Sequence, residues 1–253
     1  MIRLEVNALC QKGLVRELNE DMVSLGGVLL RDDEMSFSVE LQEDSHFCLL
    51  VSDGMGGHEH GERASQELLE YLGVCFKEVV FPADAFEIEL QNHVRLFSDE
   101  MNRCSMAENQ QHPMGCTLTG VVWANGKAYL INAGDSRTYR YRNGILRQLT
   151  VDETARGITN EPSESKLLLN CIGGGLEARL TVEDISDRLL DGDLLLLCSD
   201  GLSDMVADMD IEEILSQSQR PVAELYEKAC VNGGFDNVSV ILAKVVASQS
   251  PVS

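Results

Sequence analysis

The sequence has no apolar run approaching the roughly 20 residues that a membrane-spanning helix needs, and its first residues, 1–5, lack the apolar core of a secretion signal. It is also poor in basic residues, with 20 Lys and Arg against 42 Asp and Glu and a formal net charge of -22. Such an excess of negative charge opposes binding to nucleic acids and to anionic membrane surfaces. We therefore expect no nucleic-acid partner and no membrane association.

The eight cysteines form no CxxC pair and show no His-Cys spacing typical of metal sites. Several lie inside apolar runs, as Cys48 and Cys198 do, where a reduced thiol behaves as a small hydrophobic side chain. Scattered, reduced cysteines are typical of proteins in a reducing compartment. The sequence thus favours a cytoplasmic location.

The composition is that of a globular protein, with 253 residues, 44% of them hydrophobic and 25% charged. One domain over residues 1–247, followed by a short tail at 248–253, is the simplest organisation for this length.

Hydrophobic periodicity predicts the main elements. Helical spacing runs through 61–77 and 84–107, and two shorter helical segments are expected at about 210–217 and 221–231. Strands are predicted at 2–9, 22–30, 46–52, 116–123, 127–133, 137–142, 178–185, 193–199 and 237–246. The three central strands, separated by turns such as Asn125-Gly126, suggest an antiparallel meander. This order indicates an α+β fold in which antiparallel sheets pack face to face with helices outside.

Two polar stretches interrupt these elements. The acidic stretch 31–45 is predicted to be either a protruding hairpin or a mobile loop, and its residues do not decide between them. Residues 151–177 are polar and then rich in glycine, which is typical of an irregular flap.

Four aspartates stand beside glycine or asparagine at the ends of predicted strands: Asp53, Asp135, Asp200 and Asp236. Taken singly, an Asp-Gly pair is most often an ordinary turn. If these side chains converge at one rim of the sandwich, however, their mutual repulsion requires a compensating cation. Oxygen ligands are hard, so the sequence predicts Mn2+ or Mg2+ rather than zinc.

The residues around these aspartates form a set of recognisable strings. They are Arg16-Glu-Leu-Asn-Glu-Asp21, Asp53-Gly-Met-Gly-Gly-His58, Gly134-Asp-Ser-Arg137, Ser199-Asp-Gly-Leu-Ser-Asp204 and Gly234-Phe-Asp-Asn237. In this order they resemble the type 2C metal-dependent protein phosphatases, in their compact bacterial form, over nearly the whole chain. The resemblance implies a central β-sandwich of two antiparallel sheets flanked by pairs of α-helices, with a two-metal site at one end.

The resemblance also implies a role for each matching residue. Asp53 would bridge two Mn2+ or Mg2+ ions, and the Gly54 carbonyl would complete the shell of the second. Asp200 and Asp236 would bind the first ion, while Asp21, with Glu20 beside it, would serve the second. Asp135 and Asp204 match positions that hold a third, weaker ion together with Asp200.

Two further residues match catalytic positions of the family. Arg16 would bind the phosphate, since its planar fork suits two phosphate oxygens. His58 would protonate the departing serine or threonine oxygen. His60 is a competitor for that role, although a solvent-exposed structural histidine is the favoured interpretation of His60. The implied substrates are phosphorylated proteins, dephosphorylated by a monomeric enzyme that reverses a serine/threonine kinase. The acidic stretch 31–45 would then attract basic residues near phosphorylation sites.

Two other functions fit parts of the sequence. Cys10 and Arg16 have the spacing of a cysteine-dependent phosphatase loop, but the acidic residues that follow do not favour a thiolate. A non-catalytic relative acting as a scaffold is the second alternative, and the presence of Asp53, Asp200, Asp236 and Arg16 argues against it. Arg137 is expected to be a solvated strand residue, and the alternative is that it holds Asp135 through a salt bridge.

Overall fold

The computed structural model describes residues 2–43, 45–56, 59–79, 81–156 and 166–247. His58, with its predicted catalytic role, and the predicted tail at 248–253 lie outside these residues. Within the described part of the chain, every helix is too short or too polar to cross a bilayer.

The described strands form two antiparallel sheets. The first has the order β10-β9-β13-β14-β1-β4, and in the second, with the order β11-β6-β5-β7-β8-β12, β2 pairs with β5 and β3 pairs with β2. The strands of the first sheet are β1 (Ile2–Gln11), β4 (Asp33–Leu41), β9 (Arg137–Arg142), β10 (Ile145–Gln148), β13 (Leu194–Cys198) and β14 (Val238–Ala247). Those of the second are β2 (Asp21–Leu25), β3 (Val28–Leu30), β5 (Phe47–Met55), β6 (Gly115–Cys116), β7 (Leu118–Ala124), β8 (Lys127–Ala133), β11 (Ile172–Gly173) and β12 (Thr181–Asp184).

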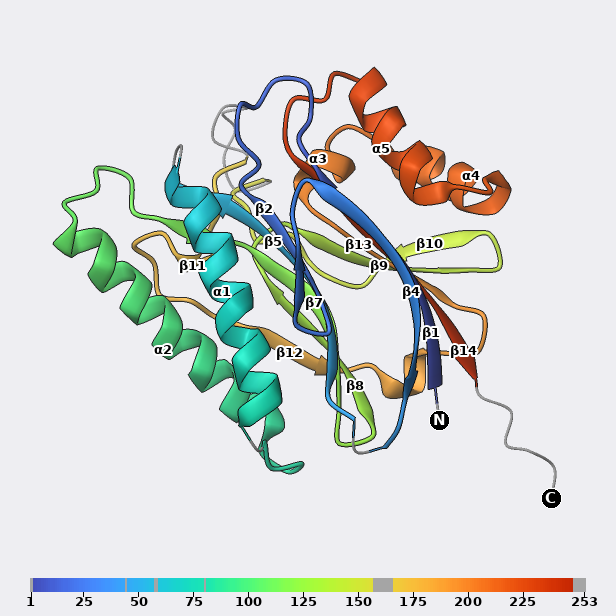
Figure 1. Ribbon diagram of the computed structural model, residues 1–253, viewed down its shortest axis with the longest axis horizontal. Coiled ribbons are helices and arrows are strands. Elements are labelled where there is room, and N and C mark those ends of the chain that lie inside the picture. Colours follow the sequence, from blue (N-terminus) through green and yellow to red (C-terminus); the bar gives the residue numbers. More distant parts are fainter. Residues whose placement is uncertain (1, 44, 57–58, 80, 157–165, 248–253) are drawn as a thin grey trace.

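The sheets pack face to face, and helices cover both outer faces (Figure 1). Helices α1 (Glu59–Glu78) and α2 (Phe86–Ala107) lie on the second sheet. The short α3 (Asp200–Ser203), α4 (Asp208–Gln217) and α5 (Pro221–Val231) lie on the first, and a 3-10 turn, η1, spans Ser186–Arg188. This arrangement confirms the predicted α+β sandwich with flanking helices.

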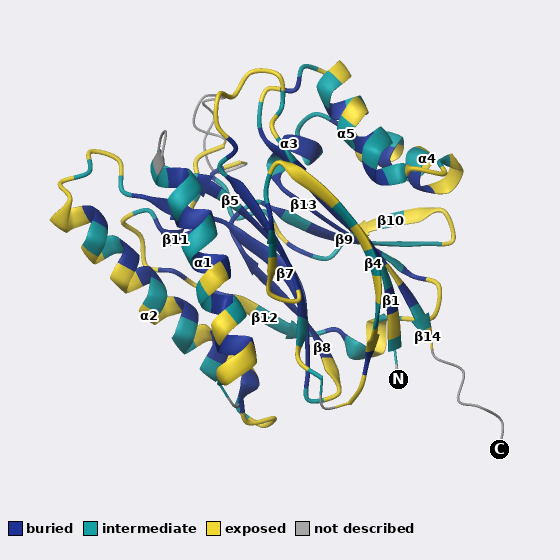
Figure 2. Cartoon of the chain, viewed as in Figure 1, coloured by how far each residue is buried: buried dark blue, intermediate teal, exposed yellow. Residues whose placement is uncertain are grey.

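The two sheets and the helices on their outer faces make four layers, and three apolar cores hold these layers together. Figure 2 shows the cores as the buried inner faces of sheets and helices. Leu49 and Ile241 belong to the core between the sheets, Leu68 to the core under α1 and α2, and Leu225 to the core under α3, α4 and α5. Every residue of β7 is buried because this strand has a sheet on one face and helices on the other.

Two predicted elements differ from the structure. β7 and β8 pair as expected, but β9 leaves them, enters the other sheet and pairs with β10 and β13, so the predicted meander of three strands is wrong. The predicted strand at 22–30 is instead a hairpin, β2 and β3, which turns at Gly26-Gly27, where both φ angles are positive.

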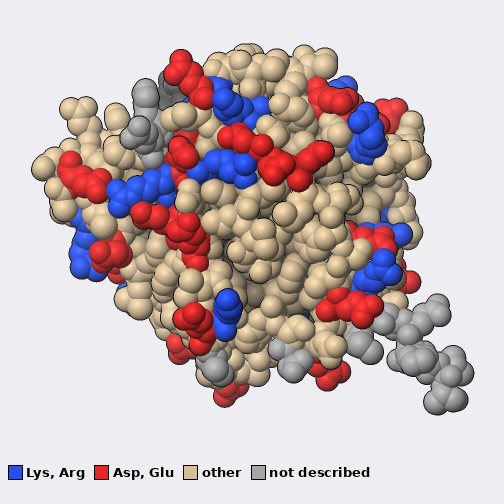
Figure 3. All heavy atoms as spheres, in the orientation of Figure 1, with Lys and Arg blue, Asp and Glu red and all other residues tan. Residues whose placement is uncertain are grey.

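The acidic stretch at 31–45 is neither a protruding hairpin nor a loop over most of its length. Its residues 33–41 form β4, which pairs with β1 along the edge of the first sheet. Met35, Phe37 and Val39 pack against the core between the sheets, and the residues that alternate with them are exposed. Exposed acidic side chains on an edge strand also discourage pairing with other chains. On the face of the molecule drawn in Figure 3, clusters of acidic and basic side chains lie side by side around a central area of uncharged residues.

Candidate metal centre and active site

One end of the sandwich, at the top of Figure 1, carries a pocket of about 760 Å³. β5 ends there, β14 begins there, and α3 starts there directly after β13. The acidic residues that line the pocket are Glu20, Asp53, Asp135, Asp200 and Asp236. The structure therefore brings the four strand-end aspartates of the sequence together, although they are far apart along the chain.

Asp21 lies beneath this pocket rather than on its wall. It is paired with Asp53 across β2 and β5, and it is almost fully buried. Its Oδ2 accepts hydrogen bonds from the hydroxyls of Ser199 and Ser239, each at 2.7 Å. Its Oδ1 is buried and has no hydrogen-bond partner among the described residues.

Burial and mutual repulsion raise the pKa values of these carboxyls. The pKa of Asp21 rises to about 7, that of Asp135 to about 7 and that of Asp200 to about 6, chiefly through burial and then through neighbouring aspartates. The pKa of Asp53 lies well above its ordinary value for the same reasons, with Asp21 the strongest neighbour. A bound cation would relieve this repulsion.

The oxygens of this site fit a hard divalent cation. Besides Asp21 Oδ1, the Oδ1 of Asp200 is buried without a hydrogen-bond partner in the described part of the chain. All of the acidic residues offer oxygen, and no histidine or cysteine lines the pocket among the described residues, which favours Mn2+ or Mg2+.

Basic side chains hold several of the same carboxylates. Arg16 Nη2 lies 2.7 Å from Asp236 Oδ2, and Arg16 Nη1 lies 4.0 Å from Glu20 Oε2. Lys166 Nζ lies 2.5 Å from Asp204 Oδ2, beside a hollow also lined by Asp135 and Asp200. Among the described residues no group of three or more His, Cys, Asp or Glu side chains is already arranged around a common point for an ion. A cation bound at Asp236 or Asp204 would compete with these ion pairs.

The glycines after Asp53 and Asp200 are required by close packing. A Cβ on Gly201 would lie 1.8 Å from the carbonyl oxygen of Asn237, and one on Gly54 would lie 2.0 Å from that of Gly61. Both contacts involve backbone atoms, so no side-chain movement relieves them. Gly54 thus lets α1 approach the end of β5, and Gly201 lets α3 approach β14. The two Asp-Gly pairs are junctions between elements rather than ordinary turns.

Arg137 and His60 also had predicted roles next to these aspartates. The predicted Arg137–Asp135 salt bridge is wrong, because Arg137 pairs with Asp152 through two hydrogen bonds of 2.8 and 2.6 Å. His60 Nδ1 lies 3.3 Å from Gln110 Nε2, and His60 is not among the residues lining the acidic pocket.

Cys10 does not have the setting of a catalytic thiolate. Its side chain is fully buried, and burial, followed by the charge of Asp21, raises the pKa of its thiol to about 12. A thiol with such a pKa stays protonated at neutral pH, so the cysteine-dependent alternative is not favoured.

Sequence reasoning missed several residues of the pocket. Lys166, Leu167, Leu168 and Leu176, from the segment after the undescribed residues 157–165, line its wall. The hydroxyls of Ser199 and Ser239 that bind Asp21, and the Asn237 amide that bonds to the backbone of residues 18 and 20, were also not predicted. Asn237 directly follows Asp236 in the string Gly234-Phe-Asp-Asn237, and this position is the sequence feature that could have indicated its role.

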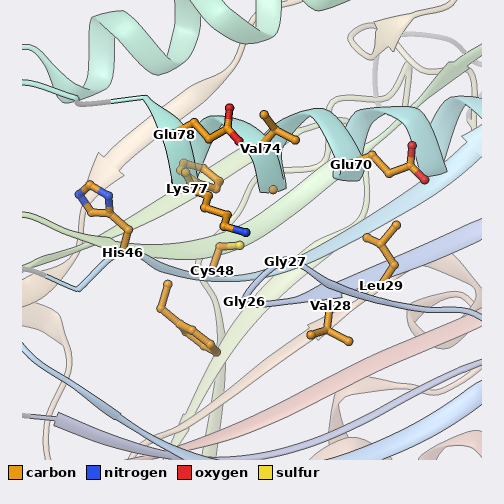
Figure 4. A pocket seen from close by; sticks show the side chains of 13 residues that line it. Gly26, Gly27, Val28, Leu29, His46, Cys48, Glu70, Val74, Lys77 and Glu78 are labelled. Atoms are coloured by element: carbon orange, nitrogen blue, oxygen red, sulfur yellow. The ribbon is translucent and has the colours of Figure 1, made fainter.

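A second cavity of similar size, about 690 Å³, lies at the far end of α1 (Figure 4). It is lined by the Gly26-Gly27 turn, Cys48, Val74 and Lys77, among others. Its two acidic residues, Glu70 and Glu78, both stand on α1 and do not face a second carboxylate cluster. This cavity therefore lacks the features of a metal centre.

A model of the family protein phosphatase 2C matches residues 27–230. The chain is 33% identical to the serine/threonine phosphatase stp of Listeria monocytogenes over 251 residues, which cover 92% of each protein. It is 35% identical to the serine/threonine protein phosphatase PstP of Mycobacterium tuberculosis over 260 residues, which cover 96% of this chain and 45% of PstP.

Solved structures agree with these matches. The catalytic domain of PstP in complex with two manganese ions aligns with a TM-score of 0.74 at 32% identity, over 98% of this chain and all of that domain. A serine/threonine phosphatase from S. agalactiae has the same fold, with a TM-score of 0.79 at 22% identity. The sequence, the fold and the acidic pocket thus agree: this chain belongs to the protein phosphatase 2C family and is a metal-dependent serine/threonine phosphatase.

Proposed function

We propose that the chain hydrolyses phosphoserine and phosphothreonine in proteins at the acidic pocket, with two Mn2+ or Mg2+ ions held there. The observation that carries the proposal is the convergence of Asp53, Asp135, Asp200 and Asp236 in one pocket. Burial and neighbouring aspartates raise the pKa values of Asp53, Asp135 and Asp200 there. The related PstP domain contains two manganese ions, which supports the same number here.

The carboxylates would divide between the two ions as the resemblance implies. Asp53 would serve both ions, and the Gly54 carbonyl would complete the coordination shell of the second ion. Asp200 and Asp236 would bind the first ion. A pair of such ions supplies a bound water of lowered pKa for direct attack on phosphorus. Asp135 and Asp204, with Asp200, would form a third and weaker site.

Asp21 and Glu20 would serve the second ion in different ways. Glu20 lines the pocket, so its carboxylate is placed to reach an ion or an ion-bound water. Asp21 lies behind Asp53, fixed by two serine hydroxyls, and its Oδ1 faces no described hydrogen-bond donor. We propose that Asp21 adds negative charge beneath the site and orients the end of β5.

Arg16 would bind the phosphate. Its guanidinium lines the pocket and is half exposed, and it pairs with Asp236 through Nη2 at 2.7 Å, so other N–H donors of the guanidinium are accessible to a ligand. A planar fork of this kind binds two phosphate oxygens at once. The proposed leaving-group acid, His58, follows Asp53 closely in sequence but lies outside the described residues.

The physiological setting is also part of the proposal. We propose a monomeric enzyme whose residues 1–247 form one catalytic domain, acting in the cytoplasm on substrates of a cognate serine/threonine kinase. In support of a reducing location, none of the eight cysteines forms a disulfide.

The test is hydrolysis of p-nitrophenyl phosphate and of a phosphothreonine peptide, with and without Mn2+, by the wild type and by Asp53→Asn. We expect EDTA to abolish activity, Mn2+ to restore it, and Asp53→Asn to lower kcat/KM at least about 100-fold, because the bridging charge is lost. Asp187→Asn, at an exposed position of the 3-10 turn η1 away from the pocket lining, is the matched control and should retain wild-type activity. Equal activity of wild type and Asp53→Asn would refute the proposal and favour a scaffold role.

A further inference from the structure

A smaller hollow of about 230 Å³, distinct from the cavity at the far end of α1, adjoins the acidic pocket. It is lined by Val15, Arg16, Glu17, Leu18 and Glu20, all from the loop between β1 and β2. Arg16 and Glu20 also line the acidic pocket, so the two hollows share a wall.

The hollow presents apolar side chains that the fold leaves uncovered. Val15 is 59% exposed and Leu18 is 40% exposed. Leu14 and Phe235, on the two loops beside them, are exposed as well. Exposed apolar residues scattered singly need no explanation, but a group of them beside a functional pocket marks a binding surface.

The loop that carries these side chains is held in place. The N–H of Leu14 donates to the carbonyl of Gly234 at 2.7 Å, and the Asn237 amide donates to the carbonyl of Leu18 at 2.9 Å. A Cβ on Gly13 would lie 2.2 Å from the Asp236 carbonyl oxygen, so the two loops are in close backbone contact. They lie side by side at the top of Figure 1. The apolar surface is thus preorganised, which lowers the entropic cost of binding.

We propose that this hollow is a specificity subsite for an apolar side chain adjacent to the phosphorylated residue of the substrate. The inference rests on the proposed function, because it needs a phosphate held at Arg16. Arg16 is part of both hollows, so a phosphate at Arg16 in the acidic pocket places the neighbouring residues of its own chain against Val15 and Leu18. The favoured occupant is therefore a leucine-like residue of the phosphoprotein rather than a separate ligand.

The charged residues of the hollow leave room for this occupant. Glu17 is exposed and Arg16 is directed to Asp236, so Val15 and Leu18 provide the apolar surface for a side chain to cover. Burying an aliphatic side chain against such a surface contributes enough to produce a preference of several-fold.

The experiment compares two phosphothreonine peptides that differ only at the residues flanking the phosphothreonine, leucine in one and serine in the other. For the wild type we expect kcat/KM to be roughly 3–10-fold higher for the leucine peptide, mainly through KM. In the double variant Val15→Ser/Leu18→Ser this ratio should fall to about 1, while the ratio of serine-peptide to p-nitrophenyl phosphate hydrolysis stays as in the wild type.

The matched control is Val28→Ser/Val74→Ser, which changes two valines that are 51% and 54% exposed beside the cavity at the far end of α1. It should keep the leucine preference. A wild type without that preference, or a control that loses it too, overturns the subsite while leaving the phosphatase activity in place. No hydrolysis of any substrate by the wild type would instead refute the proposed function. If the wild type elutes as a dimer on size exclusion and the double variant as a monomer, the surface binds a second copy and the subsite proposal is wrong.

Discussion

The guanidinium of Arg16 lies 2.7 Å from the carboxylate of Asp236, and this ion pair joins the loop after β1 to the start of β14 across 220 positions of sequence. The two residues have different proposed partners, a phosphate for Arg16 and a metal ion for Asp236. An ion at Asp236 would weaken the pair and release Arg16 toward a phosphate. Metal binding and phosphate binding should therefore be coupled.

Arg16→Ala should raise KM for p-nitrophenyl phosphate by roughly 10–100-fold, because charge-assisted hydrogen bonds to the phosphate are lost. Arg16→Lys should recover only part of this loss, since lysine offers a point charge without the planar fork. Steady-state kinetics at saturating Mn2+ measure both. The arginine would have no role in phosphate binding if both variants kept the wild-type KM.

Lys166→Ala should strengthen binding of an additional Mn2+ ion by a few-fold, because Lys166 competes with the cation for Asp204. Isothermal titration of the protein with Mn2+ measures this affinity. Lys127→Ala, which breaks the Lys127–Asp184 pair away from the pocket, serves as the control. An unchanged Mn2+ titration in Lys166→Ala would argue against a third site at Asp204.

Cys10→Ser should keep kcat within about 3-fold of the wild type, because the buried thiol with its raised pKa takes no part in attack. Its unfolding free energy should fall by about 1–2 kcal/mol, since the hydroxyl replaces a thiol packed in the core. Activity assays with thermal melts measure both quantities. Loss of activity in a folded Cys10→Ser protein would return the cysteine mechanism to consideration.

Asp193 and Arg142 form a pair whose stabilisation depends on pH. Asp193 is fully buried and accepts two hydrogen bonds, of 2.5 and 2.6 Å, from Arg142. Burial alone would raise the pKa of Asp193, but the hydrogen bonds from Arg142 and the Leu190 N–H outweigh it and lower that pKa. The pair therefore stabilises the fold fully above the unfolded pKa near 4 and loses this contribution as the pH falls through the lower folded value.

Asp193→Ala should lower the unfolding free energy by roughly 1–3 kcal/mol at pH 7, because Arg142, whose side chain is partly exposed, loses its charge-assisted hydrogen bonds to the carboxylate. The difference in unfolding free energy between this variant and the wild type should become smaller below about pH 4. Urea unfolding at several pH values measures it. Glu183→Ala, which breaks the exposed Arg188–Glu183 pair, should cost at most about 1 kcal/mol and is the comparison. If the two proteins differed in unfolding free energy by the same amount at pH 3 and pH 7, the proposed pH dependence of the Asp193–Arg142 pair would be wrong.

Gly201→Ala should be strongly destabilising, by roughly 3 kcal/mol or more, because its Cβ would meet a backbone oxygen at 1.8 Å. Gly73→Ala is the opposite case, since a Cβ within α1 would meet only the Gly27 Cα at 3.7 Å, an ordinary contact. It should stabilise by about 0.5–1 kcal/mol, as alanine favours a helix interior. Melting temperatures of the two variants should therefore shift in opposite directions.

The sequence alone determined the broad class of this protein. Period-3.6 spacing placed α1 and α2 within two residues of their observed ends, since a helix with one apolar face needs only local residues to reveal it. Aspartates at the ends of buried strands indicated a common site, because the ends of paired strands gather at one rim. The strings around them indicated the phosphatase 2C family.

Only the tertiary structure decided which strands pair and which charges meet. Alternation along 137–142 shows which residues face inward but not which strand lies alongside, so β9 was assigned to the wrong sheet. The partner of Arg137 is Asp152 rather than Asp135, and Asp21 lies behind the pocket rather than on its wall. The partner of a charged residue and the depth at which a side chain is buried both depend on distances between segments that are far apart in the chain. Local sequence patterns carry no information about those distances.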